Sequence, residues 1–158
     1  KWRNVTKDDQ LCAAGDTYTS IDFPLFRTAD AYLMAAEAIL RGANAPRSTA
    51  LDYVNEIRER AYMSDKYAQA GIRSDVSGKI NESELNLDFI LAERQREFAS
   101  ELVRRTDLIR FGKFTKNNNW DWKNGERTGT DVDDKYLLFP IPESELVNNP
   151  TLKQNEGY

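Results

Sequence analysis

The amino-acid sequence predicts a mainly α protein: a helical hairpin, then a third long helix, with long loops and an extended C-terminal strip. Three observations indicate this fold class. Two amphipathic stretches follow each other with only a short turn of Gly, Ala, Asn and Pro between them. A third stretch, Leu87 to Arg105, repeats apolar residues at helical spacing. The remaining chain is rich in polar residues, glycine and proline, which favour loops.

Length and composition suit one soluble domain, residues 1–158, with a core of its own. The chain is 40% hydrophobic and 30% charged, with a formal net charge of −4. Because there is no basic excess, we expect no nucleic-acid partner and no anionic membrane surface. No apolar run approaches the roughly 18 residues of a membrane-spanning helix, so we expect no transmembrane segment.

Histidine is absent and Cys12 is the only cysteine. This composition excludes Ser-His-Asp and Cys-His catalysis, and it excludes zinc sites built from Cys and His. With no imidazole to activate it, Cys12 is expected to be a packed or partly exposed thiol rather than a nucleophile. We therefore expect no metal and no cofactor.

The first helix is predicted from about Arg27 to Arg41, after an N-terminal stretch (residues 1–21) that resembles an extended arm. Gly42 is placed to end this helix as a C′ residue. Its apolar stripe consists of Ala29, Tyr32, Leu33, Ala36, Ile39 and Leu40. Charged residues lie opposite the stripe, namely Arg27, Asp30, Glu37 and Arg41.

The second helix is predicted from about Ser48 to Tyr62, with Ser48 as its N-cap. Its stripe consists of Ala50, Leu51, Val54, Ile57 and Ala61. Two such helices joined by residues 42–46 form an antiparallel hairpin. Its length and its Ala and Tyr content are similar to one tetratricopeptide unit, although no second copy follows.

The third helix, Leu87 to Arg105 with Asn86 as N-cap, carries charged residues within its apolar stripe. Arg94 and Glu97 are spaced i,i+3, and Glu101 and Arg105 are spaced i,i+4, so these four residues predict a structural ion ladder along one helix. The alternative is a pair of site carboxylates among Glu93, Glu97 and Glu101, as in glycosidases whose carboxyl groups stand about 5 Å apart or more. The neighbouring arginines lower a carboxyl pKa rather than raise it for acid catalysis, so ion pairing is favoured and no catalytic residue is assigned.

A short helix, Asp107 to Phe111, is expected to follow and to end at Gly112. The next stretch, Phe114 to Lys135, is predicted to be a loop that holds the best ligand-binding candidates, Trp120, Trp122, Asn118 and Asp121. Tryptophan faces stack on the apolar faces of sugars, and amide or carboxylate side chains bond their hydroxyls. The alternative is that one or both tryptophans fold back to anchor the loop.

The end of the chain has little helix propensity. Thr130–Asp134 alternates carboxylates, but it lacks the glycine and the distal glutamate of a calcium loop and indicates an acidic turn. Tyr136–Pro142 is an apolar extended strip because two prolines bar a helix. Glu143–Val147 is expected to form one helical turn.

Four segments, in this order, together resemble the C-terminal region of the SusD/RagB family. They are Asp22–Ala38, Ala50–Ala61, Ile90–Glu101 with Arg105-Thr-Asp-Leu-Ile-Arg-Phe-Gly-Lys113, and Leu138-Phe-Pro-Ile-Pro142 continued to Leu146 and by Asn149–Tyr158. The resemblance covers about Asp22 to the end. It departs from the family in length, since members are much longer, and Cys12 matches no lipidation position.

The resemblance implies a surface-exposed lipoprotein of the outer membrane, with a helical fold that contains tetratricopeptide-like hairpins. It implies non-catalytic binding of an oligosaccharide or other nutrient, and a SusC-like TonB-dependent transporter as partner. On this interpretation residues 1–21 contact an upstream part of a longer protein. The alternatives are a structural helical module that scaffolds the binder and docks on the transporter, and a glycoside hydrolase.

Overall fold

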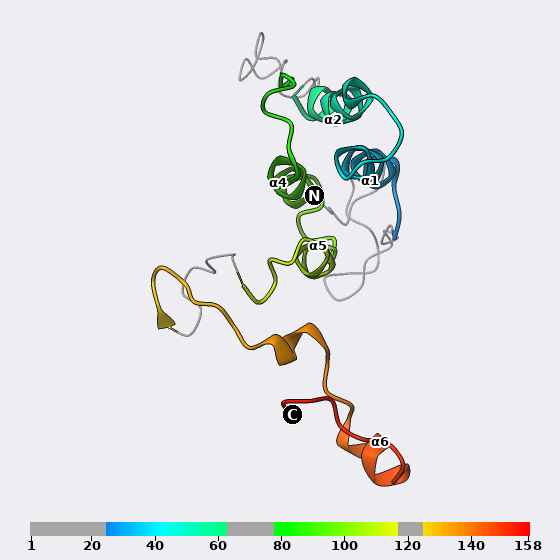
Figure 1. Ribbon diagram of the computed structural model, residues 1–158, viewed down its shortest axis with the longest axis vertical. Coiled ribbons are helices and arrows are strands. Elements are labelled where there is room, and N and C mark those ends of the chain that lie inside the picture. Colours follow the sequence, from blue (N-terminus) through cyan, green and yellow to red (C-terminus); the bar gives the residue numbers. More distant parts are fainter. Residues whose placement is uncertain (1–24, 63–77, 117–124) are drawn as a thin grey trace, which may run out of the picture.

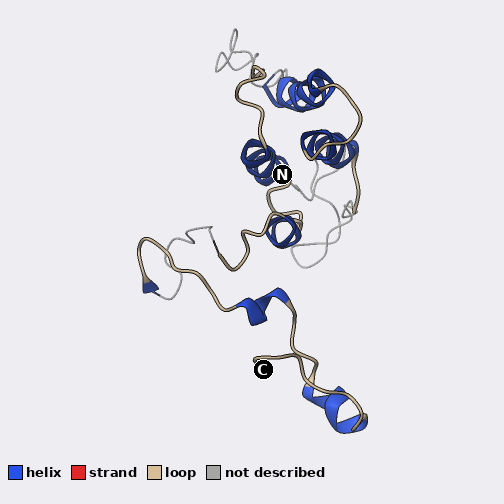
Figure 2. Ribbon diagram, viewed as in Figure 1, coloured by secondary structure: helices blue, strands red, loops and turns tan. Residues whose placement is uncertain are grey.

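The computed structural model of the chain describes residues 25–62, 78–116 and 125–158. Within these ranges every regular element is a helix, and four helices form one body (Figure 1, Figure 2). The body consists of α1 (Thr28–Leu40), α2 (Arg47–Tyr62), α4 (Leu87–Glu97) and α5 (Arg104–Arg110). α1 packs against α2 and α4, and α4 packs against α5. The mainly α fold predicted from the sequence is confirmed.

The α1–α2 hairpin has nearly the expected bounds. Gly42 follows α1 with a φ of 106°, a left-handed conformation that glycine adopts without steric cost. Leu33 of α1 and Val54 of α2 are fully buried. Tyr32 and Tyr53 stack across the interface, with ring centroids 5.0 Å apart. The apolar stripes predicted for the two helices therefore face each other.

The segment that leads into α4 is bonded to α2 by polar side chains. Asn55 accepts a hydrogen bond from the N–H of Ile80 at 2.8 Å and donates one to its carbonyl oxygen at 3.2 Å. Arg58 donates to the carbonyl oxygen of Gly78 at 2.5 Å. These bonds hold Ile80 and Leu85 in the core beside the hairpin.

The third helix is shorter than predicted. Asn86 caps it as expected, since its side chain accepts a hydrogen bond from the N–H of Phe89 at 2.8 Å. However, α4 ends at Glu97 and not at Arg105. In a continuing helix the carbonyl oxygen of Glu97 would accept the N–H of Glu101. Here the N–H of Glu101 bonds the carbonyl oxygen of Phe98 instead.

The turn between α4 and α5 has an unusual backbone. Ser100 and Leu102 have φ values of 68° and 63°, in the left-handed region that non-glycine residues rarely adopt. A helix that continued to Arg105 would place Leu102 in the same apolar stripe as Leu91 and Phe98, but Leu102 is 87% exposed. The prediction of one continuous helix was wrong because contacts from Arg27, the residue before α1, hold this turn.

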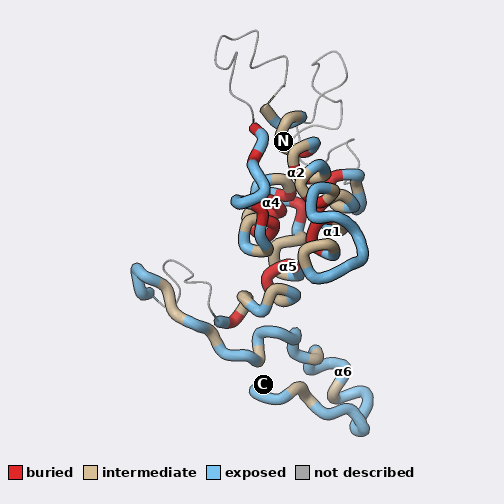
Figure 3. Tube along the Cα trace, turned by 45° about the horizontal axis from the view of Figure 1, so that its top comes forward, coloured by how far each residue is buried: buried red, intermediate tan, exposed pale blue. Residues whose placement is uncertain are grey.

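Residues 125–158, the C-terminal lobe, lie beside the helical body (Figure 1). The lobe contains a 3₁₀ turn, η2 (Asp134–Leu137), and α6 (Glu143–Asn148), where one helical turn was expected. The strip predicted to be extended is extended only from Leu138 onward, because its first residues belong to η2. Buried residues gather in the helical body, whereas the lobe is exposed or half-buried throughout (Figure 3).

Candidate functional site

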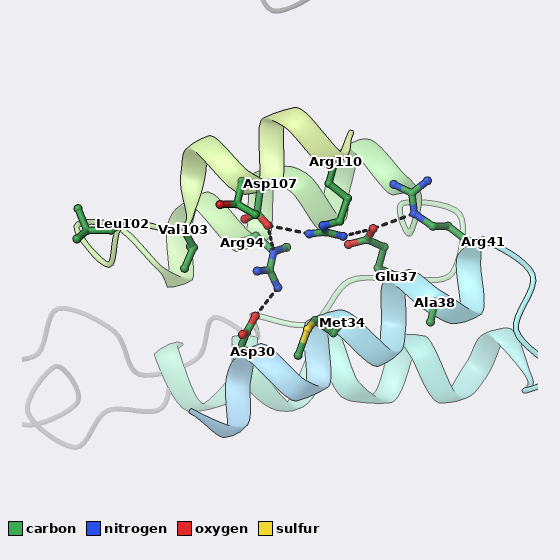
Figure 4. A pocket seen from close by; sticks show the side chains of 11 residues that line it. Asp30, Met34, Glu37, Ala38, Arg41, Arg94, Leu102, Val103, Asp107 and Arg110 are labelled. Atoms are coloured by element: carbon green, nitrogen blue, oxygen red, sulfur yellow. Dashed lines mark hydrogen bonds and ion pairs between the residues drawn. The ribbon is translucent and has the colours of Figure 1, made fainter. Parts of the chain in front are cut away.

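The predicted ligand-binding residues Trp120, Trp122, Asn118 and Asp121 lie outside the described residues, as does Cys12. Their role as glycan contacts remains a prediction. The site that the structure does describe is a charged network between α1, α4 and α5, which lines a cavity of about 480 Å³. Figure 4 shows the side chains around this cavity.

Arg94 lies at the centre of this network. Its guanidinium group donates to Asp30 of α1 at 2.7 Å and to Asp107 of α5 at 2.8 Å (Figure 4). It also lies over the ring of Phe98, 5.0 Å from the centroid. Arg94 and Asp107 are 4% and 2% exposed. Because a buried charge is stable only when it is paired, each of these two groups depends on the other.

Glu37 extends the network along α1. Its Oε1 atom accepts hydrogen bonds from Arg41 of the same helix, at 2.8 Å, and pairs with Arg110 of α5 (Figure 4). Arg110 also donates to Asp107 at 2.7 Å. Burial lowers the pKa of Arg110, but its bonds to Glu37 and Asp107 outweigh burial and raise the pKa above its ordinary value. Glu37 was expected on the polar face of the first helix; it is in fact 3% exposed, because α5 covers that face.

Glu97 and Glu101 converge on Arg27, which directly precedes α1. Arg27 binds both carboxylate oxygens of Glu101, at 2.7 and 2.9 Å. It also donates to the side chain of Glu97 at 2.5 Å and to its backbone carbonyl at 2.8 Å. Burial lowers the pKa of Arg27, but the bonds to Glu101 and Glu97 raise it overall. In a longer α4, the carbonyl oxygen of Glu97 would accept the next helical hydrogen bond. Here that oxygen accepts from Arg27, which thereby holds the chain in the turn before α5.

The ion pairs of the described structure reach partners that the predicted ladder did not include. Arg94 pairs with Asp30 of α1 and with Asp107 of α5. Glu101 and Arg105 do not lie on one continuous helix, because α4 ends at Glu97 and α5 begins at Arg104. Arg105 instead donates to the carbonyl oxygens of Tyr136 and Leu137 at 2.8 and 3.0 Å. The charges join different helices because the body offers partners that are distant in sequence.

Glu93, the third carboxylate weighed for catalysis, is also paired. It is 5% exposed, and it accepts hydrogen bonds from Arg58 of α2 at 2.8 Å and from Arg96 at 2.5 Å. The geometry of Glu93, Glu97 and Glu101 thus indicates ion pairing between helices.

Two oxygens in the cavity network are buried without a hydrogen-bond partner, Oε2 of Glu37 and Oδ2 of Asp107. A carboxylate oxygen can only accept, so these atoms suit a water molecule, a hydroxyl group or an N–H. Met34 and Leu102 form apolar parts of the cavity wall. In the described part of the chain, no group of three or more His, Cys, Asp or Glu side chains is placed to hold a metal ion.

Sequence reasoning missed most of this network. Arg27, Asp30, Asp107 and Arg110 were not assigned to it, although each is a charged residue beside an apolar helix stripe. One signal was available: α5 has an acid and a base at i,i+3, Asp107 and Arg110.

In the described ranges no helix is long and apolar enough to span a membrane.

Comparison with known proteins gives three kinds of match. A profile described as the SusD family matches residues 1–158. The chain is 41% identical to Starch-binding protein SusD of Bacteroides thetaiotaomicron, over 100% of this chain and 25% of that protein. It is 32% identical to SusD-like protein P25 of Formosa agariphila, over 85% of this chain and 24% of that protein. The chain thus spans about a quarter of the length of these relatives.

Solved structures agree with the sequence matches. A SusD superfamily protein from Bacteroides vulgatus aligns with a TM-score of 0.57 at 25% identity, covering 85% of this chain and 27% of that one. NanU of B. fragilis aligns with a TM-score of 0.51 at 28% identity, covering 87% of this chain and 27% of that one.

Proposed function

Because the chain belongs to the SusD family, we propose that it takes part in the non-catalytic binding of an oligosaccharide or a related nutrient at the outer-membrane surface. The binding supports uptake through a SusC-like TonB-dependent transporter. The observation that carries the proposal is the 41% identity, over the whole of this chain, to a protein named for starch binding. The chain matches 25% of the length of that relative, so the proposed activity is that of a whole SusD-family protein that contains such a region.

The described side chains support binding rather than turnover. An inverting or retaining glycosidase needs one carboxyl group that keeps its proton near neutral pH. Glu93, Glu97 and Glu101 each accept hydrogen bonds from arginine, so all three carboxylates are engaged in ion pairs within the protein.

Within this chain, we place the glycan contact on Trp120 and Trp122, with Asn118 and Asp121 as partners for hydroxyl groups. The test is a glycan array followed by calorimetry on the intact protein, comparing wild type with Trp120→Ala/Trp122→Ala. Stacking of an indole ring on a sugar face contributes much of the affinity of such a site. We therefore expect the double variant to lose about tenfold or more in glycan affinity.

Trp2→Ala is the matched control, since it removes the same side chain from the other end of the chain. Unchanged affinity in the double variant would remove the assignment to this loop. Release of shortened glycan from a bound ligand would contradict the non-catalytic part of the proposal.

A second candidate function is a helical scaffold that docks on the transporter without touching the glycan. The observation that favours it is the charged network, which joins α1, α2, α4 and α5 into one body through Arg27, Arg58 and Arg94. Unchanged glycan affinity in the double variant, together with retained co-purification with the transporter, would favour this function over glycan contact.

A further inference from the structure

The C-terminal lobe has defined structure but no core of its own. None of its residues, 125–158, is buried. Most of the large hydrophobic side chains exposed in the described structure lie there, and they are Tyr136, Leu137, Leu138, Phe139, Val147, Leu152 and Tyr158. Phe139 and Val147 are 73% and 72% exposed. Exposed apolar side chains concentrated in one segment mark an interface rather than a free surface.

Much of the backbone of the exposed strip already has hydrogen-bond partners. Gln154 accepts the N–H of Ile141 and donates to its carbonyl oxygen, both at 2.9 Å. Asn155 donates to the carbonyl oxygen of Phe139 at 2.8 Å, and the hydroxyl of Tyr158 donates to that of Leu138 at 3.0 Å. Because these groups are satisfied, the strip does not offer an edge for strand addition. What it presents outward is a set of apolar side chains.

The lobe is also held in place relative to the helical body. Arg105 donates to the carbonyl oxygens of η2 and lies over the ring of Phe139, 4.3 Å from its centroid. The N–H of Val132 bonds the carbonyl oxygen of Thr115 at 2.8 Å. These contacts leave the apolar side uncovered, so the surface is formed before its partner binds.

The lobe that carries this surface is negatively charged. The lobe has seven Asp or Glu residues and three Lys or Arg residues, so its formal net charge of −4 equals that of the whole chain. Glu143 and Glu145 stand in the first turn of α6, beside the exposed Val147. A complementary partner therefore has apolar pockets surrounded by basic side chains.

We propose that the exposed face of the C-terminal lobe, centred on Leu138, Phe139 and Val147, is an internal docking surface for the part of a SusD-family chain that lies outside the quarter represented here. The matched region makes up 25%, 24% and 26% of the three relatives, so about three quarters of each relative is available as the partner. The surface that receives the lobe is apolar with a basic rim. This docking proposal does not depend on which ligand the protein binds.

The test is hydroxyl-radical footprinting, read residue by residue by mass spectrometry, on two proteins. One is the 158-residue chain, and the other is full-length Starch-binding protein SusD with this chain in place of its matched quarter. We expect oxidation of Leu138, Phe139 and Val147 to be at least about tenfold slower in the full-length protein, because side chains desolvated at a packed interface are shielded from the radical. Leu33 and Ile90, fully buried in the helical body, should react slowly in both and show that the body is folded.

Two variants of the full-length protein make the test specific. Val147→Asp should restore fast oxidation of Leu138 and Phe139, because it puts a charge into an apolar interface. Asn148→Asp is the matched control: it adds the same charge one residue away without removing apolar surface, and should leave both rates slow. Equal rates in the two wild-type proteins would overturn the proposal. Slow rates in the isolated chain that rise on dilution would also overturn it, in favour of a second copy as the partner.

Discussion

Replacing Arg94 with methionine tests whether the charged network holds the helices together. Methionine keeps an unbranched side chain of similar length and helix propensity, but it removes the positive charge between Asp30 and Asp107. Asp107, whose side chain is 3% exposed, then keeps only Arg110 as an ionic partner. The substitution therefore leaves a buried carboxylate that is only partly compensated.

The expected loss in the free energy of unfolding follows from this geometry. Removing one member of a buried ion pair costs about 3–5 kcal/mol, because the other charge stays buried without its partner. Arg110 remains 2.7 Å from Asp107 and is 38% exposed, so it compensates part of the loss. We expect the lower end, about 3 kcal/mol, which corresponds to a fall in Tm of about 6–12 °C for a chain of this size.

The assay is urea denaturation followed by far-UV circular dichroism, with the m value checked for constancy. Arg96→Met is the matched control on the same helix, because Arg96 is 51% exposed and its partner Glu93 keeps its bond to Arg58. It should change the free energy of unfolding by less than about 1 kcal/mol.

The double variant Arg94→Met/Asp107→Leu separates pairing from desolvation. It should cost less than the sum of the two single variants, because no uncompensated carboxylate then remains in the cavity. A loss below about 1 kcal/mol for Arg94→Met alone would refute the reasoning and show that apolar contacts are sufficient to hold α1, α4 and α5 together.

Three other predictions follow from local geometry. Gly78→Ala should lower the free energy of unfolding by about 1–3 kcal/mol in the same urea assay, because a Cβ there would lie 2.5 Å from Cδ2 of Tyr62; an unchanged midpoint would contradict this packing. Leu102→Gly should stabilise the isolated chain by about 1 kcal/mol, since it relieves a left-handed backbone without losing buried apolar surface; destabilisation would mean that the side chain is covered. Lys116 lowers the pKa of Asp134 below its ordinary value of 3.8, so the stabilisation is present above that value and is lost as the pH falls through the lowered pKa. In an NMR titration, Lys116→Met should move this pKa back up, and no movement would exclude the ion pair as its cause.

The helices that depend on local pattern could be predicted closely. α1 and α2 lie within one or two residues of the expected bounds, because each has a single apolar stripe and a clear stop such as Gly42. Asn86 was recognised as a cap, because capping involves neighbours only three residues apart. One helical turn was expected at Glu143–Val147, and α6 spans Glu143–Asn148.

The end of α4 and the partners of its charges could not be predicted in this way. The i,i+3 and i,i+4 rules presuppose a continuous helix, whereas α4 stops at Glu97 because Arg27 binds its carbonyl from 70 residues away. Arg94 likewise finds Asp30 at a separation of 64 residues. No local pattern encodes such distances, so the sequence showed which charges needed partners without showing which partners they have.

Arg27 has a consequence for the order in which the chain folds. Its guanidinium group joins the start of α1 to the carboxylate of Glu101, 74 residues later, so the contact closes a long loop. Contacts of this kind tend to form after the local hairpin, on the native side of the folding barrier. Arg27→Ala should therefore speed unfolding in a stopped-flow chevron while leaving the folding arm almost unchanged. Arg27 therefore affects the unfolding rate, and with it the lifetime of the folded body, more than it affects the folding rate.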